Sequence, residues 1–302
     1  MSHPPYFLNV EPTSVCNLRC TICSMDGSRD PGYMDTGLYR KIIDDARAEG
    51  VTEVRLFLGG EPLLHREIAE FVRYAANAGL VTNIHTNATL LTREMSGALM
   101  DAGLAMLTFS FDGETPEEYG SIRVGGDFGK VLGNIIGFLE MKHNRNAVLP
   151  ETTMQVIKPL AVPDGSVPPL SDEFRNRFRG LPLDSWLVIP PHSWAGELNG
   201  IGEEPPGKVY FPCQLPWQSM SVAWDGRVVA CCGDLNGRII LGDLGTQTLS
   251  EVWNGDAMIR MRSQLLWSDT PKCSLCGSCT FPWRDRHPFL QELREFLGMG
   301  RG

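Results

Sequence analysis

Three cysteines stand close together near the start of the chain, at Cys16, Cys20 and Cys23, in the pattern C-x3-C-x2-C. Thiolates on one short loop can converge on a single inorganic centre. A structural zinc ion is normally closed by four protein ligands. The nearest additional candidates, His3 and Asp26, are not at a familiar zinc spacing. A four-iron cluster held by three cysteines leaves one iron free for an external ligand, so the spacing favours such a cluster.

Six further cysteines lie in the last third of the chain, at Cys213, Cys231, Cys232, Cys273, Cys276 and Cys279. Small core residues would not cluster in this way. A Cys-x2-Cys pair with two more cysteines could close a zinc site, but six cysteines exceed what one such site needs. The sequence therefore predicts a second inorganic centre in this part of the chain.

The composition is that of a packed protein. The chain has 302 residues, of which 42% are hydrophobic and 21% are charged, and this excludes disorder as the dominant state. The net charge of −9 argues against a nucleic-acid partner, which needs clustered Lys and Arg. There is neither a signal peptide nor an apolar run long enough for a membrane span. We expect a cytoplasmic protein with no membrane partner, in which cysteines favour metal or redox chemistry over disulfides.

The elements that must position these cysteines alternate between strand and helix over the first two thirds of the chain. Strands are predicted at residues 7–11, 54–58, 81–86, 106–112, 153–157 and 185–189, and helices at residues 35–49, 67–78, 92–102 and 127–143. Six repeats of strand then helix imply a parallel sheet with right-handed crossovers, in an α/β fold. Six such units form an open barrel, with function at the carboxyl ends of the strands.

The pattern changes after a Gly- and Pro-rich connection, so we predict a domain boundary near residue 205. Residues 219–223 and 227–230 flank Asp225-Gly226, which is a strong hairpin signal. Two short helices are expected at residues 249–253 and 256–266.

The amino-terminal triplet after the first strand resembles the defining motif of the radical S-adenosylmethionine (SAM) superfamily. Position 22 is often aromatic in that family and is Ile22 here. Gly59-Gly60-Glu61-Pro62 after the second strand matches the family's GGEP segment. The resemblance implies that Glu61 and the backbone of Gly59 and Gly60 bind the methionine ammonium of SAM. Read without it, this segment would be an ordinary strand-to-helix loop.

Three more positions resemble SAM-contacting residues of the family. Ser110, at the end of the fourth strand, matches a ribose-contacting position, and Arg123, in Tyr119-Gly120-Ser121-Ile122-Arg123, matches an arginine that binds the SAM carboxylate. A planar guanidinium suits a carboxylate, although a surface salt bridge is the alternative for Arg123. Asn87 stands where relatives often have T-N-G, and it could equally be an ordinary turn residue.

The carboxy-terminal third resembles the SPASM/twitch auxiliary-cluster domain of radical SAM enzymes. The resemblance implies a partial (β/α)6 radical SAM barrel over residues 1–205, followed by a small cysteine-rich α+β auxiliary iron–sulfur domain over residues 206–302. In the shorter twitch form, one [4Fe-4S] cluster would be held by Cys213, Cys231, Cys273 and Cys276. Cys232 would then be a small buried residue, and Cys279 could substitute for a ligand or protect the cluster.

The resemblance also implies the chemistry: reductive cleavage of SAM to a 5′-deoxyadenosyl radical, which abstracts a substrate hydrogen. The auxiliary cluster would accept an electron, and a flavodoxin- or ferredoxin-type donor would supply the first one. The chain begins almost at the first strand, which favours a small polar substrate such as a sugar, aminocyclitol or nucleoside over a peptide. A peptide- or protein-modifying enzyme and a non-catalytic zinc-binding module are the alternatives. His192 is a weak candidate proton acceptor and Trp194 a candidate sugar-stacking wall, or both are ordinary loop residues.

Overall fold

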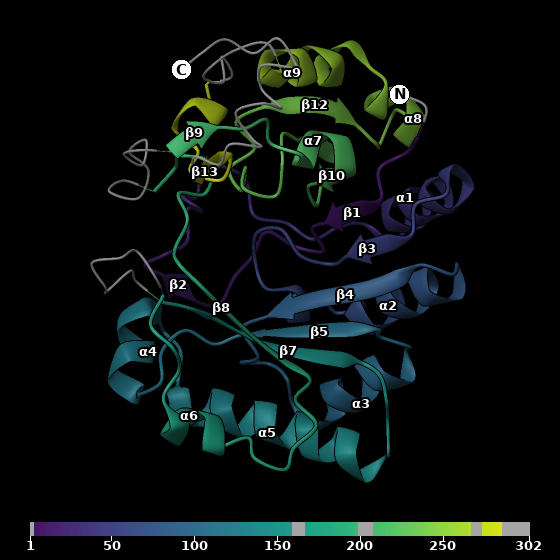
Figure 1. Cartoon of the computed structure of the whole chain (residues 1–302). Coiled ribbons are helices and arrows are strands. Elements are labelled where there is room, and N and C mark those ends of the chain that lie inside the picture. Colours follow the sequence, from purple (N-terminus) through teal and green to yellow (C-terminus); the bar gives the residue numbers. More distant parts are fainter. Residues whose placement is uncertain (1–2, 159–166, 199–207, 267–273, 286–302) are drawn as a thin grey trace.

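A nine-stranded sheet runs through the centre of the computed structural model, which describes residues 3–158, 167–198, 208–266 and 274–285 (Figure 1). Its strand order is β12-β11-β10-β1-β3-β4-β5-β7-β8. Six of these strands form a continuous parallel series, which confirms the predicted α/β fold: β1 (Phe7–Val10), β3 (Glu53–Arg55), β4 (Val81–Thr86), β5 (Met106–Ser110), β7 (Glu151–Ile157) and β8 (Ser185–Ile189). Strand β3 is shorter than the predicted residues 54–58 and ends at Arg55.

The helices begin where the sequence offers capping side chains. Asp35, Thr92 and Asp127 each accept a backbone N–H hydrogen bond at the start of α1 (Thr36–Glu49), α3 (Arg93–Asp101) and α5 (Phe128–Asn144). The four longer helices, including α2 (Ile68–Asn77), match the predicted segments. Two shorter helices, α4 (Pro116–Ile122) and α6 (Asp172–Asn176), were not predicted, and they too are capped, by Thr115 and Ser171.

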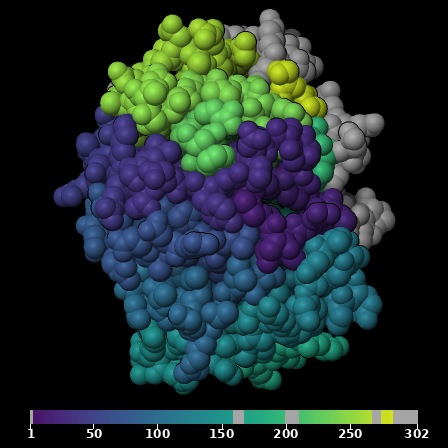
Figure 2. Space-filling view, turned by 180° about the vertical axis from the view of Figure 1, so that it is seen from behind, coloured from purple at the N-terminus to yellow at the C-terminus, as the bar shows by residue number. Residues whose placement is uncertain are grey.

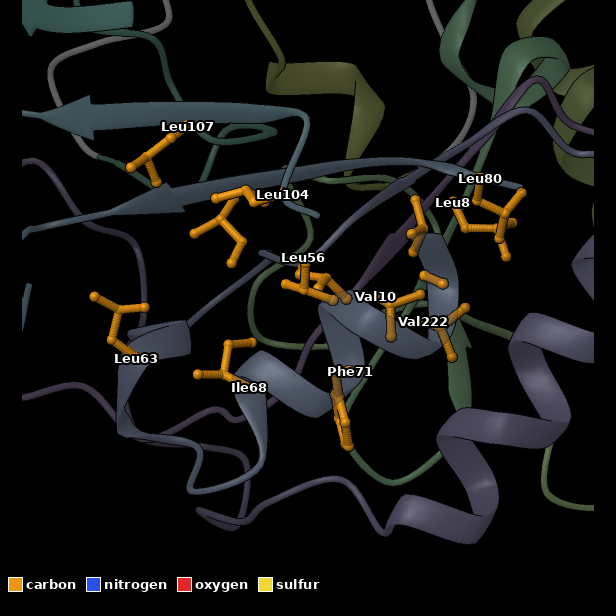
Figure 3. Close-up of a cluster of buried hydrophobic side chains, with 14 of the residues drawn as sticks. Leu8, Val10, Leu56, Leu63, Ile68, Phe71, Leu80, Leu104, Leu107 and Val222 are labelled. Carbon is orange, nitrogen blue, oxygen red and sulfur yellow. The ribbon is translucent and has the colours of Figure 1, made fainter. Parts of the chain in front are cut away.

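One face of the sheet packs against the helices and carries the hydrophobic core (Figure 3). Leu8 and Val10 of β1, Leu56 after β3 and Phe71 of α2 are all buried in it. Val222, from the carboxy-terminal third of the chain, lies beside Val10 in the same core. Residues from both ends of the sequence therefore share one core.

Three strands of the auxiliary segment extend the barrel sheet. The predicted hairpin is present as β10 (Ser219–Val222) and β11 (Arg227–Val229), and β12 (Ile240–Asp243) follows it. Strand β10 pairs in parallel with β1 along all four residues of each strand. This pairing places residues of the carboxy-terminal third of the chain directly against the first strand (Figure 2).

The remaining auxiliary elements pack over this end of the sheet (Figure 1). The predicted helices are present as α8 (Leu249–Trp253) and α9 (Asp256–Leu266), beside the short α7 (Leu215–Gln218). Strand β9 (Lys208–Tyr210) pairs with β13 (Trp283–Asp285). The predicted boundary near residue 205 lies outside the described residues and stays a prediction. In the described part of the chain, no helix combines the length and apolar character needed to cross a membrane.

Candidate functional site

The cysteine triplet lies on the loop that follows β1, as the sequence predicts. Within it, β2 (Arg19–Cys20) pairs with β6 (Arg123–Val124), and this pairing sets Cys20 opposite Arg123. A second contact, from the Thr21 N–H to the Ile122 carbonyl at 2.9 Å, fixes the loop against the end of α4. The backbone of Cys23 turns back on Cys20 through a 3.1 Å hydrogen bond. The loop therefore holds the thiols and Arg123 together.

The three thiols share one electrostatic environment. Burial raises the pKa of each, and the charge of a neighbouring cysteine raises it further: Cys20 acts on Cys16, Cys23 on Cys20, and Cys16 on Cys23. The positive charge of Arg123 opposes the rise at all three. A bound cation would lower the pKa of the thiols, as Arg123 does, and would therefore favour their thiolate forms. Among the residues that the structure describes, no three His, Cys, Asp or Glu side chains are close enough to hold a single metal ion.

The glycines after β3 let that loop press against the residues that precede the triplet. Gly60 has φ +67°, and a Cβ there would lie 2.2 Å from the Thr13 carbonyl oxygen. The next residue, Glu61, donates its backbone N–H to the Val15 carbonyl at 2.9 Å. Gly59 donates to the buried carboxylate of Glu11 at 3.0 Å. The glycines thus allow the loop after β3 to lie directly against the backbone of Thr13 and Val15, just before Cys16.

Glu61 is a buried carboxylate that ties two strand ends together. Its oxygens accept from the Leu63 N–H at 3.0 Å, the Thr86 hydroxyl at 2.6 Å and the Asn87 N–H at 2.8 Å. Burial raises its pKa, against the lowering effect of these hydrogen bonds and of Arg123. A carboxylate has about four acceptor positions. Three are used, so one remains for the ammonium group that the sequence predicts there.

Replacing Glu61 by Gln is expected to weaken SAM binding by about 1.5–3 kcal/mol, or roughly 10- to 150-fold in Kd, because a charge-assisted contact is lost. Iron content should stay at the wild-type level, since Glu61 is not a cysteine ligand. Calorimetric titration of the iron-loaded protein with SAM measures the change. An unchanged Kd would contradict a contact between Glu61 and SAM. The role of Glu61 would then be structural, connecting the ends of β3 and β4.

Arg123 forms a buried ion pair. Its Nε donates to Asp112 at 2.8 Å and its Nη2 lies 2.6 Å from the same oxygen, while the other Asp112 oxygen accepts from the Ile157 N–H at 2.7 Å. Burial lowers the pKa of Arg123, but the charge of Asp112 and its hydrogen bond, together with the charges of Cys20 and Tyr119, raise it overall. The guanidinium also reaches the Cys20 thiol. The salt bridge is therefore present, although inside the site and not on the surface, and carboxylate binding by Arg123 stays a prediction.

Three other candidate positions lie at strand ends or on the triplet loop. Asn87 is buried and links the end of β4 to the triplet loop, because its amide donates to the Asn17 side chain at 3.0 Å. Ser110 ends β5 in register with Gln155 and is half-buried. The Ile22 carbonyl accepts from the Trp194 indole at 2.7 Å. The sequence analysis did not predict roles for Thr86, Asp112 and Asn17. Each of them lies within two residues of a candidate site residue.

The auxiliary cysteines gather around Cys231. Burial raises the pKa of Cys231 well above its usual value, and charges on Cys232, Cys213 and Cys279 raise it further. Cys276 begins the 3-10 turn η2 (Cys276–Ser278), which leads directly into Cys279. Cys273 lies outside the described residues, so its predicted ligand role stays a prediction. The structure places Cys279, expected only as a substitute or protective residue, near two of the predicted ligands.

His192 and Trp194 lie on the connection between barrel and auxiliary segment. Burial lowers the pKa of His192, and its Nδ1 accepts from the Trp194 backbone N–H at 3.3 Å. The Trp194 ring packs with Cys23, Met25 and Cys232 against a small apolar cluster. These contacts give both residues local structural roles, and proton acceptance by His192 stays a prediction.

The sheet face opposite the helices is polar. Side chains alternate along each strand, so Arg55, Asn83 and His85 lie opposite the buried core residues. His85 stacks on Phe57 with ring centroids 3.8 Å apart, and burial lowers its pKa to about 4, so its imidazole is neutral. The Asn83 carboxamide oxygen is buried without a hydrogen-bond partner among the described residues. Parallel sheets are ordinarily apolar on both faces, so this face is suited to a polar ligand.

Comparison with known proteins agrees with this site. The sequence matches the radical SAM superfamily over residues 10–153 and the SPASM iron–sulfur cluster-binding domain over residues 213–280. The chain therefore carries a radical SAM domain followed by a SPASM domain. SAM and two [4Fe-4S] clusters are accordingly its cofactors. The clustered thiols, with Arg123 beside the first group and an acceptor position left on Glu61, fit these cofactors.

Individual relatives are similar over different lengths. The chain is 38% identical to the PqqA peptide cyclase of Rhodopseudomonas palustris over 124 residues, 40% of this chain and 32% of that protein. The alignment thus spans about a third of that relative. A PqqA peptide cyclase of Gluconobacter oxydans is 25% identical over 93% of this chain and 84% of its own.

Solved structures share the fold. BtrN, solved in complex with AdoMet and 2-DOIA, has a TM-score of 0.63 and 19% identity, covering 93% of this chain and 94% of its own. The anSMEcpe structure with bound AdoMet has a TM-score of 0.64 and 18% identity, covering 98% of this chain and 96% of its own.

Proposed function

We propose that this protein is a radical SAM oxidoreductase that dehydrogenates a small polar metabolite, such as a sugar, aminocyclitol or nucleoside. Cys16, Cys20 and Cys23 hold the SAM-binding cluster, and Cys213, Cys231, Cys273 and Cys276 hold the auxiliary cluster. When bound, these groups supply reductive cleavage of SAM to a radical that takes a substrate hydrogen, and an acceptor for the electron that the substrate then loses. A flavodoxin- or ferredoxin-type protein supplies the reducing electron.

The observation that carries this proposal is the polar sheet face. Among the described residues, the Asn83 carboxamide oxygen has no hydrogen-bond donor and the neutral imidazole of His85 has no hydrogen-bond partner. Arg55 is held in place by Glu53 at 2.8 Å and lies over the Phe7 ring at 3.6 Å. Hydroxyl or amine groups of a compact ligand would satisfy these side chains. The similarity to BtrN, solved with 2-DOIA, supports the same class of substrate.

The chain's own residues do three things in this reaction. The remaining acceptor position of Glu61 and the guanidinium of Arg123 orient the amino-acid end of SAM. Ser110, at the carboxyl end of β5, contacts its ribose. The polar face holds the substrate beside them, because β3, β4 and β5 end at the same edge of the sheet. The proton that the substrate releases passes to a base, for which His192 is a candidate.

Peptide modification is the second candidate, favoured by the similarity to PqqA peptide cyclases and to SuiB of Streptococcus suis, solved with its precursor peptide SuiA. Extract from the native host separates the two proposals. The iron-loaded, reduced enzyme receives SAM and either the dialysable or the retained fraction, each with and without prior protease treatment. We expect the dialysable fraction to stimulate 5′-deoxyadenosine formation. We also expect this stimulation to persist after protease treatment of the fraction. Stimulation abolished by protease would favour the peptide substrate.

A further inference from the structure

The two carbonyl groups that flank Cys23 are held by side chains from distant parts of the chain. The Ile22 carbonyl accepts from the Trp194 indole N–H at 2.7 Å, and the Ser24 carbonyl accepts from the Asn236 amide at 2.8 Å. The Asn236 carboxamide oxygen also accepts from the Asp26 N–H at 3.1 Å. The backbone on both sides of Cys23 is therefore held by two residues, Trp194 and Asn236, that belong to none of the barrel strands and helices.

The Asn236 donor is itself rigidly placed. It is 6% exposed, and its amide also donates to the Glu197 carboxylate at 3.1 Å. The buried Asp234 carboxylate shapes the loop around it by accepting from the Arg238 N–H at 2.7 Å. This loop begins at Cys231, since the Asp234 N–H donates to the Cys231 carbonyl at 3.1 Å. One short loop thus carries an auxiliary cysteine and the contact to the triplet.

The Trp194 donor is placed in a similar way. Its ring packs with Cys23 and Cys232 against the apolar cluster of Leu58, Ala223, Val229 and Leu235. Two residues later, Gly196 approaches Ser278 so closely that a Cβ would lie 2.0 Å from its hydroxyl oxygen. Ser278 directly precedes Cys279, so this donor too is anchored next to an auxiliary cysteine.

We propose that Trp194 and Asn236 are positioning residues for Cys23, through which the auxiliary segment sets the direction of the third thiolate of the SAM-binding cluster. The inference rests on the proposed cluster at the triplet. A buried carbonyl that loses its donor is costly to leave unpaired, so the loop would shift to expose it. The Cys23 side chain would move with the loop, whereas the auxiliary cysteines would keep their own contacts.

Arg238 provides a matched control. It belongs to the same loop, and its guanidinium contacts the side chains of Asp26 and Glu197. In the part of the chain that the structure describes, it donates to neither carbonyl beside Cys23. Its side chain is 43% exposed, and exposed ion pairs of this kind contribute little. Arg238→Met therefore removes a contact between the auxiliary loop and the triplet segment without removing either donor.

The test compares Trp194→Phe, Asn236→Ala and Arg238→Met as iron-loaded proteins. Iron content and the electron paramagnetic resonance spectrum of the reduced protein are recorded with and without SAM. We expect wild-type iron in all three. In the first two variants, the SAM-induced spectral change should be altered and the Kd for SAM raised about tenfold, as for one lost hydrogen bond. Both should be unchanged in Arg238→Met.

Wild-type spectra and SAM affinity in both Trp194→Phe and Asn236→Ala would overturn the inference, as would an equal effect of Arg238→Met. If Asn236→Ala does not fold, Trp194→Phe decides alone, because it keeps an aromatic ring against the apolar cluster and removes the indole N–H donor. Failure of the proposed function looks different: the wild type itself would then show no SAM-responsive cluster.

Discussion

Replacing Cys16, Cys20 and Cys23 together by alanine is expected to lower iron from about eight to about four atoms per chain, because one of two four-iron clusters loses all its protein ligands. Formation of 5′-deoxyadenosine from SAM should fall to background, since the open iron that binds SAM belongs to that cluster. Iron and acid-labile sulfide assays, with chromatography of the nucleoside products, measure both effects.

The matched control for this variant is Cys232→Ala. Cys232 is half-buried and packs against the same apolar cluster as Cys23, but the proposed ligand sets do not include it. We expect this variant to keep about eight irons and full SAM cleavage. Wild-type iron in the triplet variant would contradict the assignment of the first cluster, and loss of four irons in Cys232→Ala would move Cys232 into a ligand set.

The second large effect concerns the auxiliary cluster. Cys213→Ala combined with Cys276→Ala should remove its four irons and leave the triplet cluster in place. Both substitutions avoid the loop from Cys231 to Asn236, so the donor to the Ser24 carbonyl is preserved. SAM cleavage should therefore continue, while oxidised product per 5′-deoxyadenosine should collapse, because the substrate would lose its electron acceptor.

The ratio of product to 5′-deoxyadenosine at saturating substrate decides between two roles for this cluster. If the auxiliary segment only shapes the substrate site, the folded double variant should bind substrate more weakly and still give the wild-type ratio. A wild-type ratio would end the electron-acceptor role. Circular dichroism of the variant checks that the segment is folded, since cluster loss can unfold the region that it holds together.

Local signals in the sequence were sufficient for most elements of the barrel. Asp35, Thr92 and Asp127 mark helix starts, and the structure has a capped helix at each. The cysteine spacing and the Gly59-Gly60-Glu61 segment likewise indicated the site, because motif and function lie within a few consecutive residues. Such signals are strong where the contacts that stabilise an element are close in sequence.

Contacts between distant residues were not predictable in this way. Nothing local indicates that β10 pairs with β1, because Ser219 and Phe7 are separated by most of the chain. The ion pair of Arg123 with Asp112 and the bond from Trp194 to Ile22 also depend on the complete fold. The sequence suggested ligand binding for Arg123 and a stacking role for Trp194, whereas their observed partners are protein groups. Side-chain chemistry could be predicted from residue type, but not the choice of partner.

The central claim is that the triplet and the residues around Glu61 form a site where SAM is reductively cleaved. The most direct measurement is the yield of 5′-deoxyadenosine and methionine from SAM, with the anaerobically reconstituted wild-type protein, with and without a strong one-electron reductant. The account predicts equal amounts of both products, formed only when the reductant is present. A fully iron-loaded protein that binds SAM and forms neither product under reducing conditions would contradict it.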